Sequence, residues 1–122
     1  MKPKRGQFSL FKREHLRSPA DFRRVYERRC SASDALLLVF ACPNGLDYLR
    51  FGFSVSKKIG NAVVRNRFRR LYREAFRLTR QEMPTGLDII LIPRSNQEPS
   101  LAELKQSLPR LVEKLAQRLG QS

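Results

Sequence analysis

The sequence predicts a single α+β domain in which one mixed β-sheet is backed by helices, a sandwich-like α/β arrangement with the element order α-β-β-β-α-β-α. Three observations support this fold class. The 122 residues suffice for one hydrophobic core and leave no room for a second. Hydrophobic residues make up 41% of the chain, which argues against wholesale disorder. Segments with helical spacing of apolar residues alternate with segments of period two or of continuous apolar character.

The chain begins with a basic arm, residues 1–17, and residues 18–119 form the predicted folded core. A helix is predicted to start at Ser18-Pro19, because serine is a good N-cap and proline suits the first helical position. The helix ends near Arg29. Its apolar face consists of Phe22, Val25 and Tyr26.

Three strands are predicted next. Cys30–Ser33 is a short candidate, Ala35–Cys42 is a continuous apolar run, and Tyr48–Ser56 alternates between apolar and small or polar residues. The turn signal Pro43-Asn44-Gly45 lies between the last two segments, which predicts that they pair as a β-hairpin.

The second helix is predicted from Gly60-Asn61 to about Arg80, followed by a strand at Leu87–Ile92 and a last helix that begins at Pro99-Ser100. The core-facing stripe of the second helix is predicted to be Val64, Phe68, Leu71, Ala75 and Leu78. Pro109 interrupts the leucine stripe of the last helix. Because proline removes a backbone donor, it predicts a break or bend there.

Positive charge is concentrated in two blocks of the chain. The net charge is +14, of which residues 1–29 carry +7 and residues 57–80 carry +8, whereas the remaining segments are close to neutral. Arginine outnumbers lysine 18 to 7, and the planar guanidinium grips phosphates with two parallel hydrogen bonds. This pattern indicates a polyanionic partner, most simply nucleic acid.

The second helix carries the clearest functional pattern. With its apolar stripe facing the core, Arg69, Arg73 and Arg77 form a ridge of like charge, which weakens an isolated helix and so favours a binding role. The helix start at Gly60-Asn61 offers backbone amides, a second feature that suits phosphate. The alternative is a solvated cationic face without a ligand.

The run Phe53–Phe76, which contains KKIGNAVVRNRFRRLYREAF from Lys57 onward, closely resembles the signature of the bacterial ribonuclease P protein subunit. The resemblance extends over nearly the whole chain, and Pro109 is its one departure. It implies a left-handed crossover around the arginine-rich helix, where general rules of chirality predict a right-handed one. It also implies an accessory subunit whose partner RNA carries the chemistry and removes the 5′ leader of precursor tRNA.

The resemblance, together with the charge pattern, gives three groups of candidate site residues. Contacts with the catalytic RNA are expected at Lys57, Lys58, Asn61, Arg65, Asn66, Arg67, Arg69, Arg70 and Arg73. A cleft for the single-stranded leader is expected at Phe22, Tyr26, Phe40, Ser54 and Ser56. The basic arm contributes Lys12, Arg13 and Arg17. Aromatic side chains stack on any base, although the same three rings could instead belong to the core.

The protein itself lacks the pattern of a nuclease. It has one histidine, His15, which is expected at the surface, and its acidic residues are scattered. Cys30 and Cys42 lack the spacing of a zinc site and are expected to be free thiols. No cofactor is therefore expected on the protein alone, and Mg²⁺ in the holoenzyme is expected to be held mainly by RNA phosphates.

The expected partners are the catalytic RNA and precursor tRNA, with no obligate protein partner. No apolar run reaches the length of a membrane span and no secretion signal is recognised, so a cytoplasmic location is expected. Two other binding roles fit the charge. A structural rRNA-binding protein of the ribosomal type would associate with rRNA and leave tRNA maturation unaffected, and a DNA-binding architectural protein would need a recognition helix or a dimer face.

Overall fold

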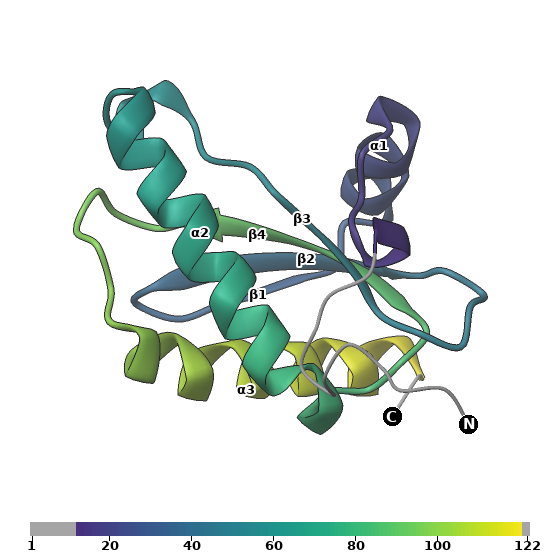
Figure 1. Cartoon of the computed structure of the whole chain (residues 1–122). Helices are drawn as coiled ribbons and strands as arrows, with labels where there is room; N and C mark the ends of the chain where they lie inside the picture. The colour runs from purple at the N-terminus through teal and green to yellow at the C-terminus, as the bar shows by residue number, and fades with distance from the viewer. Residues whose placement is uncertain (1–11, 121–122) are drawn as a thin grey trace, which may run out of the picture.

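The computed structural model describes residues 12–120, which form a four-stranded mixed sheet with helices on both faces (Figure 1). The strands are β1 (Ser31–Ser33), β2 (Leu37–Pro43), β3 (Arg50–Phe53) and β4 (Leu87–Pro93). Their order across the sheet is β1-β2-β4-β3. β2 is antiparallel to both β1 and β4, whereas β3 is parallel to β4. The predicted fold class and order of elements are confirmed.

Three α-helices begin where the sequence predicts. They are α1 (Pro19–Arg28), α2 (Ala62–Thr79) and α3 (Leu101–Leu119), and the short 3-10 turns are η1 (Lys12–Glu14), η2 (Lys57–Ile59) and η3 (Arg80–Glu82). Each α-helix starts with a side-chain cap. Ser18 Oγ accepts from Ala20 N, Asn61 Oδ1 accepts from Val64 N, and Ser100 forms a reciprocal capping box with Glu103. None of these helices has the length and apolar character that a membrane span requires.

The sheet separates two hydrophobic clusters. Alternate residues of β4 point to opposite faces, so Ile89 and Leu91 join the large cluster with α2 and α3, whereas Ile90 joins the smaller cluster under α1. β4 is paired on both edges and covered on both faces. This central position explains why its sequence is almost continuously apolar.

The predicted hairpin between the second and third strands is wrong. β2 and β3 do not pair, because β4 lies between them and bonds to both. β3 is also shorter than the predicted Tyr48–Ser56, since only residues 50–53 lie beside β4. Leu49, Phe51 and Val55 are buried, as the alternation in that segment predicts, but the alternation carries no information about which strand is the neighbour.

The predicted core stripe of α2 is partly wrong. Phe68 and Ala75 are buried as expected, but Leu71 and Leu78 are only half-buried. Tyr72, Phe76 and Thr79 are buried in their place. The helix is therefore rotated toward its aromatic residues, and the Phe76 ring stacks on Phe51 of β3 with centroids 4.0 Å apart.

Pro109 does not break the last helix, which runs continuously from Leu101 to Leu119. One backbone hydrogen bond is lost at a proline, but buried residues on both sides of this position hold the helix in place. These residues are Leu104, Leu108, Leu111 and Leu115. Packing against α2 and the sheet thus outweighs the local preference.

The connection from β3 through α2 to β4 determines where the basic helix lies. In Figure 1, α2 passes in front of the sheet, while β3 and β4 both run from right to left with β4 below β3. This path is a left-handed crossover, the hand that the resemblance implies and the opposite of the usual one.

Candidate nucleic-acid interface

The basic residues of α2 lie on its solvent side, and most of them are exposed. The exposed members of the predicted RNA-contact set are Lys57, Lys58, Asn61, Asn66, Arg67, Arg70 and Arg73, whereas Arg65 and Arg69 are half-buried. Arg69 donates to Asn66 Oδ1 at 3.0 Å, and Arg67 Nε donates to Glu98 Oε1 at 3.0 Å. The one acidic residue in α2, Glu74, is paired with Arg77. The outer face is therefore strongly cationic.

The start of α2 is a tight corner. Gly60 has φ of +155°, and a Cβ at this position would meet Val64 Cβ at 2.9 Å, so only glycine fits without displacement. Asn61 Oδ1 already accepts from Val64 N. The Val64 amide, one of those predicted to be free for phosphate, is therefore occupied. The two exposed lysines of η2 are the main phosphate-binding groups at this corner.

The three predicted aromatic residues lie together on the other face of the sheet. Phe22, Tyr26 and Phe40 are all half-buried and pack on the smaller cluster under α1. The rings of Tyr26 and Phe40 meet edge to face with centroids 5.1 Å apart. Each ring is thus supported from below and retains an accessible part.

Phe22 rests directly on the backbone of β3. A Cβ on Gly52 would lie 2.6 Å from Phe22 Cζ and 3.2 Å from Leu16 Cβ, so any larger residue would displace the ring. Gly52 therefore lets the aromatic ring of Phe22 approach the strand closely. The small residues on this face of β3 were visible in the sequence, but their partner was not.

A hollow of about 360 Å³ connects Phe22 with the basic helix, and we call it the Phe22 hollow. It is lined by His15, Leu16, Arg17, Phe22, Phe51, Gly52, Phe53, Arg69 and Arg73. The aromatic and cationic surfaces, predicted as two separate sites, therefore meet at this point. Tyr26, Phe40, Ser54 and Ser56 do not line it. Ser54 is half-buried and donates its backbone N–H to Leu91 O, and Ser56 is exposed.

The end of the predicted arm forms one wall of the Phe22 hollow. Leu16 N donates to Phe51 O at 2.8 Å, and an almost fully buried ion pair joins Glu14 to Arg80 at the end of α2. His15 is half-buried rather than on the surface, with its ring 4.7 Å from that of Phe51. Lys12, Arg13 and Arg17 are exposed, and residues 1–11 of the arm lie outside the described residues.

Asp88, which is fully buried, anchors α1 and β3 to the central strand. It accepts hydrogen bonds from Arg50 Nε at 2.8 Å, Arg50 Nη2 at 2.7 Å and Asn44 Nδ2 at 2.9 Å, and it forms an ion pair with Arg24 of α1. Burial raises the pKa of this carboxyl, but the hydrogen bonds from Arg50, Arg24 and Asn44 outweigh burial and lower the pKa overall. No local sequence pattern indicates these partners.

The described residues hold no cluster that resembles a metal centre. Within residues 12–120, no three His, Cys, Asp or Glu side chains gather as metal ligands would. Cys30 and Cys42 are free thiols in the structure, as the sequence predicts, and burial raises the pKa of Cys42.

The family model for ribonuclease P matches residues 10–116, which include the Phe22 hollow and the whole of α2. The chain belongs to the ribonuclease P protein family. Its sequence is 41% identical over 101 residues to the ribonuclease P protein component of Alkaliphilus metalliredigens, covering 82% of this chain and 91% of that protein. The same component of Clostridioides difficile is 40% identical over 101 residues, covering 81% and 89%.

Solved structures of ribonuclease P proteins share the fold. The protein from Thermotoga maritima superimposes with a TM-score of 0.75 at 31% identity, covering 83% of this chain and 96% of that one. The Staphylococcus aureus protein gives a TM-score of 0.71 at 34% identity, covering 87% and 97%. The family membership predicted from the run Phe53–Phe76 is confirmed.

Proposed function

We propose that this ribonuclease P protein acts as the accessory subunit of a ribonucleoprotein that removes the 5′ leader from precursor tRNA in the bacterial cytoplasm. It binds the catalytic RNA through the basic face of α2. It binds the single-stranded leader through the aromatic side of the sheet, which consists of Phe22, Tyr26 and Phe40. The observation that carries the proposal is the Phe22 hollow, where Phe22 lies beside Arg69 and Arg73. One chain can thereby hold the leader next to the RNA that cuts it.

The basic face of α2 suits a folded RNA. Arg70 and Arg73 are exposed, and their side chains make no hydrogen bond or ion pair within residues 12–120. A guanidinium that has no protein partner can form two parallel hydrogen bonds with a backbone phosphate. Lys57 and Lys58 extend the same charge beyond the start of the helix. Such contacts hold the RNA without reading its sequence.

The Phe22 hollow suits a single strand. A flat ring supplies a surface on which any base stacks, and the arginines at positions 17, 69 and 73 can follow the backbone charge. Tyr26 and Phe40 continue the aromatic side, and Ser54 and Ser56 remain candidate contacts near the end of β3. This chemistry tolerates any leader sequence, which a subunit that serves many precursors needs.

The residues that line the Phe22 hollow do not form a hydrolytic centre of their own. They include one imidazole, His15, whose ring packs against Phe51, and no carboxylate. General acid–base catalysis needs a positioned acid and base. The catalytic RNA therefore carries the chemistry, with Mg²⁺ held mainly by its phosphates, and the protein contributes affinity and charge neutralisation.

Replacing Arg67 by alanine is expected to weaken binding to the catalytic RNA and to reduce its salt dependence. Each lost phosphate contact lowers the slope of log affinity against log salt by about 0.7–0.9, because fewer counterions are released. The same result is expected for Arg65→Ala. Filter binding or fluorescence titration over a series of salt concentrations measures the slope.

Lys114→Ala is the matched control, because Lys114 is exposed on α3 and lies outside the proposed interface. It should leave the slope close to that of the unchanged protein. If neither arginine variant changes the slope, the RNA does not bind this face of α2, and the proposed contact between α2 and the catalytic RNA is contradicted.

A further inference from the structure

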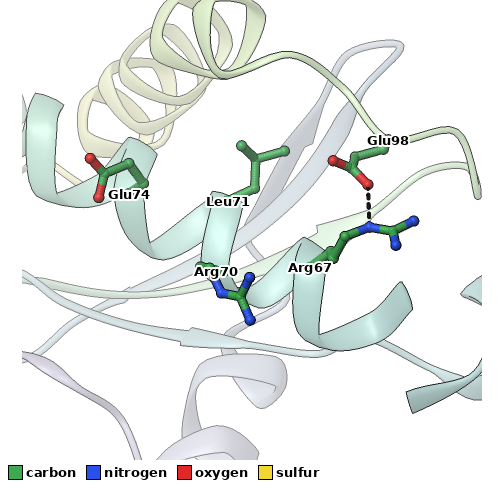
Figure 2. A pocket seen from close by; sticks show the side chains of 5 residues that line it. All are labelled: Arg67, Arg70, Leu71, Glu74 and Glu98. Carbon is green, nitrogen blue, oxygen red and sulfur yellow. Dashed lines mark hydrogen bonds and ion pairs between the residues drawn. The ribbon is translucent and has the colours of Figure 1, made fainter. Parts of the chain in front are cut away.

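An exposed ion pair joins the basic helix to the loop between β4 and α3. Arg67 Nε donates to Glu98 Oε1 at 3.0 Å, and the two side chains are 51% and 41% exposed (Figure 2). Pairs this exposed add little to folding stability, because water screens them and two long side chains must be ordered. The pair therefore calls for a reason other than stability.

The geometry of the pair leaves the binding end of Arg67 open. Glu98 engages only Nε, and the two Nη nitrogens make no hydrogen bond within residues 12–120. Figure 2 shows these nitrogens directed away from Glu98. The guanidinium plane is thus held along one edge, while the Nη edge, which can grip a phosphate with two hydrogen bonds, faces outward.

The surroundings make Glu98 the carboxylate available for this task. The pair borders a hollow of about 340 Å³ that is lined by Arg67, Arg70, Leu71, Glu74 and Glu98. Glu74 is already held by Arg77 through Nε and Nη2. Arg70 has no partner within the described residues. Of the two arginines at this hollow, Arg67 alone is oriented in advance.

We propose that Glu98 is a positioning residue that orients Arg67 for a phosphate of the partner RNA, an inference that rests on the proposed function of α2. An arginine held in its binding rotamer loses less side-chain freedom when the RNA binds, so the affinity rises without a new contact to RNA. The same carboxylate also repels phosphate, and a useful test must separate the two effects.

Two neutral substitutions at position 98 make that separation. Glu98→Gln and Glu98→Ala both remove the negative charge, but only glutamine keeps an oxygen that can accept from Arg67 Nε. We expect Glu98→Gln to bind the catalytic RNA at least as tightly as the unchanged protein. We expect Glu98→Ala to bind about three- to tenfold more weakly than Glu98→Gln, the range for ordering one long side chain.

The decisive step repeats both substitutions in an Arg67→Ala background. If Glu98 acts through Arg67, the affinity ratio between the glutamine and alanine variants should fall to one there. The exposed Glu82 in η3 provides the matched control, since Glu82→Gln and Glu82→Ala should bind equally in both backgrounds. Thermal melts of every variant identify any that fail to fold, and affinities are compared among folded variants.

Equal affinity of Glu98→Gln and Glu98→Ala, in a protein whose affinity falls with Arg67→Ala, would overturn the positioning role and leave the proposed function intact. A ratio that persists in the Arg67→Ala background would also overturn it. If Arg67→Ala itself leaves the affinity unchanged, the proposed contact between α2 and RNA fails at that residue, and the positioning role fails with it.

Discussion

Asp88→Asn is expected to destabilise the domain by about 3 kcal/mol, the lower end of the range for breaking a buried ion pair. Asp88 is fully buried and is paired with Arg24 and Arg50. Asparagine would leave the two guanidinium groups with only the partly exposed Asp21 as a counter-charge, 3.2 Å from Arg24 and 3.9 Å from Arg50. The partial exposure of Arg24 moderates the loss, because water can solvate part of the released charge. Urea unfolding monitored by circular dichroism measures the change in free energy.

Asp47→Asn is the matched control, because Asp47 is exposed on the loop that leads to β3. It should change the free energy of unfolding by less than about 0.5 kcal/mol. A loss of similar size in both variants would show that the Asp88 network does not hold α1 and β3 to the sheet.

The same network has a consequence for pH dependence. Because the pKa of Asp88 is lowered in the folded state, the unfolded chain takes up the proton first as the pH falls. The stability that Asp88 contributes is therefore fully present above the unfolded carboxyl pKa of about 3.9 and is lost as the pH falls through the folded pKa. The free energy of unfolding should therefore fall less steeply in acid for Asp88→Asn than for the unchanged protein. If the two proteins lose stability in parallel as the pH falls, this expectation is contradicted.

Phe22→Ala is expected to weaken binding of leader-bearing precursor tRNA to the holoenzyme by about 1–3 kcal/mol, the value of one base–aromatic stack. Its effect on mature tRNA, which has no leader, should be small. Tyr26→Ala is expected to act in the same direction if the leader continues along the aromatic side. The affinity should be measured for precursors with leaders of increasing length, so that the loss appears only once the leader reaches the ring.

Phe22→Leu separates stacking from packing. Leucine retains apolar contact with Gly52 and Leu16 but has no flat ring. If Phe22 acts by stacking, Phe22→Leu should melt close to the temperature of the unchanged protein and still bind leader-bearing RNA more weakly. Equal losses for leader-bearing and leaderless RNA, together with a lower melting temperature, would assign these aromatics to the core.

The elements of the fold were predictable because their signals are local. The caps at Ser18, Asn61 and Ser100 and the apolar periodicities all act within a few residues of sequence. The strand order was not predictable in this way, because β3 would bury the same side chains beside β2 as it does beside β4. The stripe of α2 was misplaced because Tyr72 and Phe76, which the sheet buries, also fit a helical spacing.

The site was predictable to the same extent. The cationic face of α2 follows from charge and spacing, but the Phe22 hollow depends on how α2 and the end of the arm meet at β3. The Glu14–Arg80 pair joins residues 66 positions apart, and the Arg67–Glu98 pair joins residues 31 positions apart. No local pattern encodes such distant partners, so only the fold could reveal them.

The measurement that tests the proposed function most directly is cleavage of a leader-bearing precursor tRNA by the catalytic RNA at low Mg²⁺, with and without this protein. A protein that neutralises phosphates and holds the leader should restore accurate cleavage under conditions in which the RNA alone is slow, and the protein alone should release no leader. No stimulation of the RNA by the folded protein, or accurate cleavage by the protein without RNA, would contradict the proposal.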